Sequence, residues 1–183
     1  MDGVEHVVFV ALGSNLGDRL AALRAAVRTL AEHSELRFDL AHDVSSLYET
    51  SPVGGPADQP PYLNSVLRVR TSLAAIDLLA AVLSIETSLG RVRKEQWGPR
   101  VIDIDLLFVG DTVIDSPTLT LPHPRLHERR FVLEPLSELA ADLIHPLIGV
   151  SIGELAQRLR RDRGTDTVTR IQGPEWVFES PAW

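Results

Sequence analysis

Apolar and polar positions follow two different rhythms along this chain. Residues 4–12, 62–71 and 101–109 are continuous apolar runs or alternate between apolar and polar side chains, which predicts three β-strands. Residues 19–31 and 74–89 instead carry apolar side chains at helical spacing and predict two amphipathic helices. The first half of the chain therefore alternates between strand and helix.

A further strand is expected within residues 36–48, although the pattern leaves its edges poorly defined. Residues 50–61 contain four prolines and two glycines, which excludes a helix or a central strand and predicts a long functional loop. The resulting order βαββαβ predicts an α+β, ferredoxin-like sandwich with an antiparallel sheet and long catalytic loops. Helices on one face would leave the other face of the sheet free for loops and ligands.

The second half of the chain is harder to interpret. Residues 115–124 are rich in turn-forming residues, and residues 131–141 look helical. Residues 151–161 predict a short amphipathic helix with Ser151 as N-cap and Glu154 three residues later. The last twenty residues show no clear pattern. We expect a single catalytic domain over residues 1–183, with a core at about 4–146 and an extension at about 147–183.

Composition narrows the classes of function. The chain has 183 residues and a net charge of −7, which disfavours a general nucleic-acid binder. It has no cysteine, so thiolate metal sites and disulfides are excluded, and oxygen-ligated Mg²⁺ becomes the natural metal. The N-terminus lacks a basic region and no apolar stretch approaches about 18 residues, so neither a signal peptide nor a membrane span is expected. These features predict a cytoplasmic enzyme.

The segment from residue 91 to residue 108 carries the strongest chemical signal. Its first half has no apolar period and holds four cations, so it predicts a basic loop: Arg91, Arg93, Lys94 and Arg100. Asp103 and Asp105 follow on a strand, where residues two apart share a face at about 6.6 Å spacing. Adjacent carboxylates in apolar surroundings repel each other, and divalent cations would relieve that cost. Cations beside a metal site suggest a polyphosphate ligand.

Spacing alone leaves other interpretations open. The two acids also fit a solvated strand face, and paired acids on a strand also serve nucleotidyl transfer. An RNA-binding module on the same frame would need exposed aromatic residues and a basic face, which the net acidity disfavours. Residues 13–17 lack the lysine of a P-loop and suggest a structural turn. Glu86 on the second helix fits either a residue that orients a loop arginine or a surface acid.

Several ordered motifs together resemble the 6-hydroxymethyl-7,8-dihydropterin pyrophosphokinase family of folate biosynthesis. The resemblance covers roughly residues 7–146. It rests on Gly13-Ser-Asn-Leu-Gly, Tyr48-Glu-Thr-Ser-Pro-Val-Gly, Gln59-Pro-Pro-Tyr-Leu-Asn, Gly90-Arg-Val-Arg-Lys, Trp97-Gly-Pro-Arg-Val-Ile-Asp-Ile-Asp and Leu121-Pro-His-Pro-Arg-Leu-His-Glu-Arg-Arg-Phe. Membership would imply a ferredoxin-like fold and transfer of pyrophosphate from ATP to the pterin hydroxymethyl group, with release of AMP.

The resemblance also implies a role for individual residues. Asp103 and Asp105 match the metal ligands, with two Mg²⁺ ions expected beside ATP. The catalytic group would be Arg91, Arg100, Asp103 and Asp105. The nucleotide would be bound by Arg91, Arg93, Lys94, Trp97, Arg100, His123 and Arg129. The flat pterin would stack between Tyr62 and Phe131, with Asn64 on its polar edge and Thr50 and Val53 from the long loop.

Some features depart from the family pattern. The loop at residues 50–61 is one residue longer than the common form, and residues 94–97 form a segment one residue shorter. Pro124 and Thr118 also stand where other residue types are common. These differences bear on loop motion and adenine contacts.

The expected partners are ATP and the pterin, without nucleic acid or membrane, and a monomer is expected.

Overall fold

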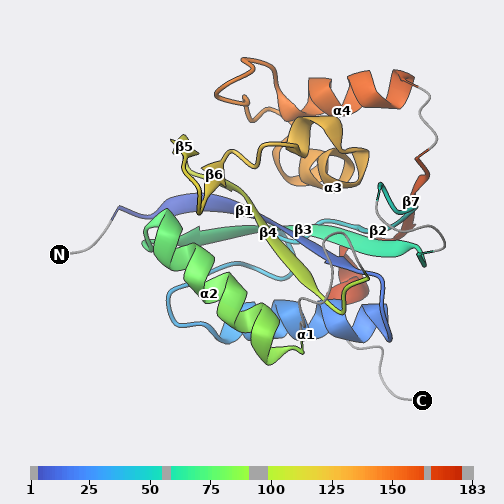
Figure 1. Ribbon diagram of the computed structural model, residues 1–183, viewed down its shortest axis with the longest axis horizontal. Helices are drawn as coiled ribbons and strands as arrows, with labels where there is room; N and C mark the ends of the chain where they lie inside the picture. Colours follow the sequence, from blue (N-terminus) through green and yellow to red (C-terminus); the bar gives the residue numbers. More distant parts are fainter. Residues whose placement is uncertain (1–3, 55–58, 91–98, 163–165, 179–183) are drawn as a thin grey trace.

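One antiparallel sheet organises the chain. The structure is a computed structural model that describes residues 4–54, 59–90, 99–162 and 166–178. Five strands lie in the order β4-β1-β3-β2-β7 (Figure 1). Their bounds are β1 His6–Ser14, β2 Leu47–Thr50, β3 Tyr62–Thr71, β4 Asp103–Val109 and β7 Val168–Gln172. A two-stranded hairpin of β5 Ile114–Asp115 and β6 Thr120–Leu121 follows β4.

Helices pack on both faces of this sheet (Figure 1). The crossover helices α1 (Arg19–Glu32) and α2 (Ala75–Ser88) cover one face, where side chains such as Val8 and Val10 enter the main core. On the opposite face, α3 (Arg130–Ala140) and α4 (Ile152–Arg161) pack over a second apolar cluster that includes Phe9 and Phe108. Two short 3₁₀ helices complete the described elements: η1 (Leu126–Glu128) precedes α3, and η2 (Pro174–Val177) follows β7.

The predicted βαββαβ order and ferredoxin-like fold are confirmed. β3 has the predicted bounds, and the four predicted helices and the first and fourth strands agree to within two residues. The Asp18 side chain accepts a hydrogen bond from the Ala21 N–H, and Ser151 Oγ accepts one from the Glu154 N–H, as expected for N-caps. Local patterning therefore determines most of these elements.

The strand expected within residues 36–48 is wrong for most of its length, because β2 only begins at Leu47. Asp39 and Asp43 explain the difference. The Asp39 N–H donates to Asp43 Oδ2, and the Ala41 N–H donates to Asp39 Oδ1, so side chains occupy the backbone donors that a strand would pair. Before β2, the backbone of this segment forms isolated bridges with β3, such as Val44 with Leu67, instead of a continuous ladder.

Two further expectations need correction. The face opposite α1 and α2 is only partly free, because α3 and α4 cover its other half and leave the remainder for the site described below. The last twenty residues, in which we expected no pattern, contain β7 and η2. Trp176 in η2 is fully buried, and its indole N–H donates to the Ser45 carbonyl at 2.9 Å.

Within the described residues, no helix combines the length and apolar character needed to cross a bilayer.

Candidate active site

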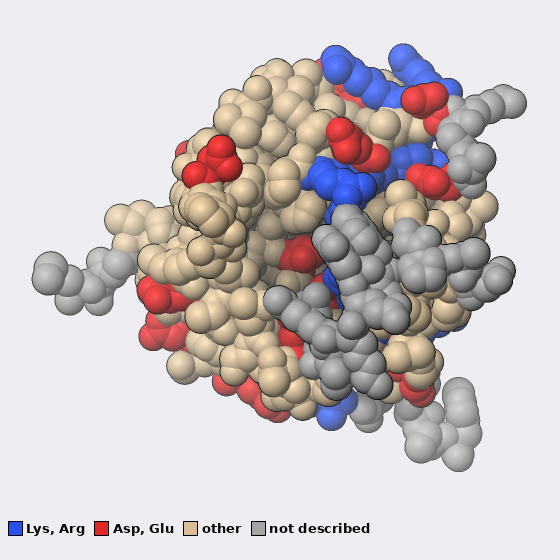
Figure 2. Space-filling model, in the orientation of Figure 1, with Lys and Arg blue, Asp and Glu red and all other residues tan. Residues whose placement is uncertain are grey.

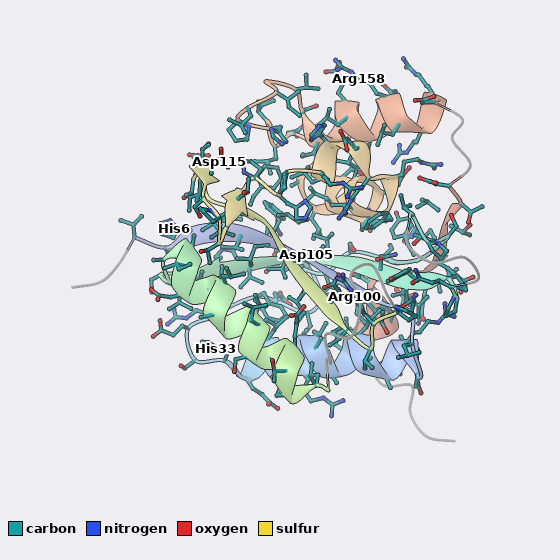
Figure 3. The ribbon with its side chains drawn as sticks, in the orientation of Figure 1. His6, His33, Arg100, Asp105, Asp115 and Arg158 are labelled. Carbon is teal, nitrogen blue, oxygen red and sulfur yellow. The ribbon has the colours of Figure 1, made fainter. Side chains whose placement is uncertain are left out.

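The two acids of β4 lie on the sheet face that α3 and α4 leave open. Asp103 pairs with Gly13 and Asp105 with Ala11 across the β1–β4 ladder. β1 in turn pairs Gly13 with Asn64 on β3, so these positions share one face. The carboxylates are therefore brought beside the predicted pterin-binding strand by sheet register rather than by loops. Figure 3 places Asp105 on β4, between the two helical layers, with Arg100 near the start of the strand.

Gly13 on β1 lies between Asp103 on β4 and Asn64 on β3, with which it pairs in the sheet. A Cβ added at Gly13 would lie 3.1 Å from Asn64 Oδ1, 3.8 Å from Tyr62 Cδ1 and 4.0 Å from Asp103 Cβ. The residue has no unusual backbone angle, so the constraint is space. A side chain here would press on the Asn64 amide and fill the space between Tyr62 and Asp103.

The predicted pterin-binding residues form one wall. Tyr62 and Asn64 project from β3, and Thr50, at the end of β2, pairs with Tyr62 in register. The Asn64 amide Nδ2 donates to Thr50 Oγ1 at 2.7 Å, and both residues are buried. That hydrogen bond fixes the amide orientation, which leaves the Asn64 carbonyl oxygen toward Gly13 as an acceptor. Burial raises the pKa of the Tyr62 phenol, so it stays neutral.

Two arginines also line the site. Arg100 Nη1 donates to Asp103 Oδ2 at 2.5 Å. The Arg129 guanidinium lies 5.5 Å from the centre of the Phe131 ring, at the start of α3. Burial and the neighbouring Arg125 lower the pKa of Arg129. Arg129 is thus partly desolvated and directed into the site, where an anion would be a favourable partner.

His123 is a neutral group in this setting. Burial and the charge of Arg129 lower the pKa of His123 to about 4. Its Nδ1 accepts a hydrogen bond from the Arg125 N–H at 3.2 Å, so the other ring nitrogen carries the proton and can donate to a ligand.

Asp105 has the environment of a cation ligand. Burial, then the neighbouring Asp103 and Glu86, raise the pKa of Asp105 well above its ordinary range, although Arg129 and Arg100 oppose the shift. A divalent cation between the two carboxylates would remove this cost, and oxygen ligands suit Mg²⁺. The described residues contain no cluster of three or more ligating side chains, so Asp103 and Asp105 would need water or a ligand to complete a metal shell.

All these groups surround one cavity of about 260 Å³. Ten of the fourteen residues predicted from the sequence line it: Thr50, Val53, Tyr62, Asn64, Arg100, Asp103, Asp105, His123, Arg129 and Phe131. Figure 2 shows acidic atoms inside a hollow near the middle of one face, with basic atoms at its upper edge. The other four predicted residues, Arg91, Arg93, Lys94 and Trp97, lie outside the described residues.

Comparison with known proteins agrees with this arrangement. The family model of 7,8-dihydro-6-hydroxymethylpterin-pyrophosphokinase (HPPK) matches residues 9–141. The chain belongs to the HPPK family. The resemblance stated from the motifs is therefore confirmed, and the family region contains every residue predicted for the site.

Curated HPPK relatives match over most of their length. The chain is 43% identical over 136 residues to the 2-amino-4-hydroxy-6-hydroxymethyldihydropteridine pyrophosphokinase of Bacillus subtilis, covering 74% of this chain and 79% of the relative. The Pseudomonas aeruginosa protein of the same name is 45% identical over 139 residues, covering 76% and 83%.

Solved structures share the HPPK fold. A Plasmodium falciparum HPPK-DHPS triple mutant superposes with a TM-score of 0.68 at 14% identity, over 86% of this chain. The wild-type P. falciparum HPPK-DHPS with pterin and p-hydroxybenzoate gives 0.67 at 15% identity, over 87%. The chain spans less than half of each of these longer chains, 44% and 42%. At this identity the likeness concerns the fold.

Asn15 supports the site, a role that the sequence did not predict. Its Oδ1 accepts from the Arg100 N–H at 2.8 Å, and its N–H donates to the Arg100 carbonyl at 3.1 Å. Its Nδ2 donates to Gln59 Oε1 at 3.2 Å and to the Pro60 carbonyl at 3.3 Å. The turn expected at residues 13–17 is confirmed only from Asn15 onward, because Gly13 and Ser14 belong to β1, and this turn also joins two segments beside the cavity. Its signal was an asparagine between two glycines, which also suits an ordinary turn.

Glu86 on α2 is not a surface acid, because its side chain is buried and bonds to the backbone of β4. It is 1% exposed, and its Oε1 accepts a hydrogen bond from the Ile104 N–H at 2.7 Å. α2 therefore holds the backbone between Asp103 and Asp105. The sequence indicated this role only by placing an acid at a position of the helix where the apolar period continues.

Proposed function

We propose that this chain transfers the pyrophosphoryl group of ATP to the hydroxyl of 6-hydroxymethyl-7,8-dihydropterin, giving the pterin diphosphate and AMP in folate biosynthesis. The observation that carries the proposal is the single cavity in which two acids and two arginines face an aromatic and amide wall. Membership of the HPPK family supports the same reaction.

Each half of the cavity suits one substrate. The pterin ring would lie between Tyr62 and Phe131, with Asn64 on its amide-like edge. Thr50 fixes the Asn64 amide through a 2.7 Å hydrogen bond, so the edge would be recognised without rearrangement. Val53 adds apolar surface from the long loop.

The triphosphate would lie across the acids. Asp103 and Asp105 would hold Mg²⁺, which would neutralise charge on the triphosphate, and we propose two such ions. Arg100 and Arg129 would stabilise charge that moves onto the leaving AMP, and neutral His123 would donate a hydrogen bond. Arg91 would act with Arg100, and Arg93, Lys94 and Trp97 would close over ATP.

Catalysis in this proposal depends on position and charge. The pterin hydroxyl attacks the β-phosphorus in line, the bond from that phosphorus to the AMP oxygen breaks, and the hydroxyl proton passes to Asp105 or to water. No covalent intermediate is needed. Monomeric state and cytoplasmic location stay predictions.

Product identification tests the proposal. The purified protein would be incubated with ATP, MgCl₂ and the pterin alcohol, and the nucleotides separated by ion-exchange chromatography. AMP that forms only when pterin and Mg²⁺ are both present is expected. ADP would indicate transfer of one phosphoryl group, and free pyrophosphate would indicate nucleotidyl transfer; either result would refute the proposal.

A further inference from the structure

The C-terminal strand lies outside the family region yet borders the site. The HPPK family model ends at residue 141, whereas β7 spans Val168–Gln172. β7 pairs antiparallel with β2, from Leu47 opposite Gln172 to Thr50 opposite Val168. Without β7, the four-residue β2 would be the edge of the sheet. Short edge strands leave backbone groups unpaired, so β7 completes the support of β2.

The pairing continues past β2 into the substrate loop. The Ser51 N–H donates to the Thr167 carbonyl at 3.0 Å, and the Thr167 N–H donates to Ser51 Oγ at 3.0 Å. Thr50 and Ser51 both line the cavity, whereas Thr167 does not. This reciprocal pair of hydrogen bonds, which we term the Ser51–Thr167 clasp, therefore acts on the cavity wall from outside.

The C-terminal segment is itself firmly anchored. On the α1 side of the sheet, buried Trp176 donates to the Ser45 carbonyl, and Arg24 Nε donates to the Trp176 carbonyl at 2.7 Å. On the α3 side, Arg170 Nε donates to Ser46 Oγ at 2.7 Å. The segment thus bonds to residues 45 and 46, just before β2, and to Ser51, just after it. β2 is held at both ends.

We propose that β7 is a positioning element for the pterin half of the site, acting through the Ser51–Thr167 clasp. This inference rests on the proposed function. The clasp fixes the backbone at Ser51, and with it the Thr50 hydroxyl that orients the Asn64 amide. The acids and Arg100 are at the far side, on β4 and the segment before it, and have no hydrogen bond with β7 or Thr167 among those of the described residues. The clasp should therefore affect pterin binding selectively.

Thr167→Pro tests the clasp, because proline removes the donor to Ser51 Oγ and keeps a carbonyl. Thr167→Ala is the matched control, since it retains both backbone hydrogen bonds. Calorimetry would give the Kd of the pterin alcohol and, separately, of a non-hydrolysable ATP analogue with Mg²⁺. We expect Thr167→Pro to weaken pterin binding by about fivefold or more, with the Kd of the analogue within about twofold of the parent.

A second pair of variants keeps the test decisive if Thr167→Pro unfolds. Ser51→Ala removes the acceptor hydroxyl, and Ser51→Thr retains one; only Ser51→Ala should weaken pterin binding. Unchanged pterin affinity in folded Thr167→Pro and in Ser51→Ala would overturn the inference. So would equal weakening of both ligands, because that would make β7 a general support. Failure of the parent protein to bind the pterin would instead count against the proposed function.

Discussion

At the scale of single residues, the site combines groups whose charges are costly without a ligand. Asp105 is half-buried beside Asp103, and Arg129 is partly desolvated beside Arg125. Such groups are typical of functional sites, because binding a cation or a polyphosphate offsets the cost of burial. The residues thus favour ligand binding at the expense of stability.

Asp105→Asn should separate stability from activity. Removal of one of two adjacent, half-buried carboxylate charges should raise the unfolding free energy of the metal-free protein by about 1 kcal/mol, or a few degrees in Tm. Turnover should fall by about a thousandfold or more, because a metal ligand is lost. Calorimetry in EDTA and an AMP-release assay would measure both effects.

Asp103→Asn is the matched control for this prediction. It should abolish turnover without raising Tm to the same extent, because it also breaks the ion pair with Arg100. Near-parental AMP release by either variant would contradict the metal assignment.

His123 should make stability depend on pH. Its pKa in the folded protein is about 4, below the ordinary value near 6.5, so the unfolded chain takes up a proton first as pH falls. The free energy of unfolding should therefore have its full value above pH 6.5 and decrease by about 3 kcal/mol between pH 6.5 and 4. Urea unfolding across that window would measure the slope.

His123→Asn should reduce that slope. Part of the pH dependence of stability should remain, because burial also lowers the pKa of His145. A slope equal to that of the parent would mean that His123 is not desolvated in the folded protein.

At the scale of elements, the turn after β1 holds the two halves of the site in place. Asn15 bonds to Arg100 through Oδ1 and to Gln59 and Pro60 through Nδ2. A single buried amide therefore joins the segment before β4 to the end of the long loop.

Asn15→Ala and Asn15→Asp should differ in effect. Alanine removes both sets of side-chain bonds and should cost about 1–3 kcal/mol of stability and raise KM for both substrates. Aspartate keeps the acceptor for the Arg100 N–H and loses the donors to residues 59 and 60. Its main effect should be on KM for the pterin. Steady-state kinetics would decide, and equal KM values for parent and Asn15→Asp would argue against a role for these loop contacts.

Elements with a strong local pattern were predictable, whereas those that depend on distant partners were not. β3 and α2 follow from periodicity, and Asp103 and Asp105 follow from strand spacing. The polar sequence of β7 gives no apolar alternation, and the strand forms because β2 offers it an unpaired edge. Asn15 and Glu86 were ambiguous because their roles depend on backbone groups more than fifteen residues away.

At the scale of the whole molecule, the C-terminal segment completes the core. Trp176 is fully buried and belongs to the main cluster under α1, far in sequence from its neighbours. The family region alone would leave this position empty, so residues beyond 141 contribute to the stability of the fold.

Trp176→Ala should destabilise the protein by about 3–5 kcal/mol, because it leaves a large cavity and removes the donor to the Ser45 carbonyl. Trp176→Phe should cost less, since most of the apolar volume remains. Urea unfolding would measure both. A change below about 1 kcal/mol for Trp176→Ala would show that the C-terminal segment is dispensable for the core.

In the proposed reaction, the acids, the arginines and the aromatic side chains act on two substrates in one cavity. Phosphorus NMR of the reaction with ATP, Mg²⁺ and the pterin alcohol tests it most directly. The account predicts a pterin product with two coupled phosphorus resonances, together with the single resonance of AMP. The paired resonances of ADP, or the single resonance of free pyrophosphate, as the product of turnover would contradict it.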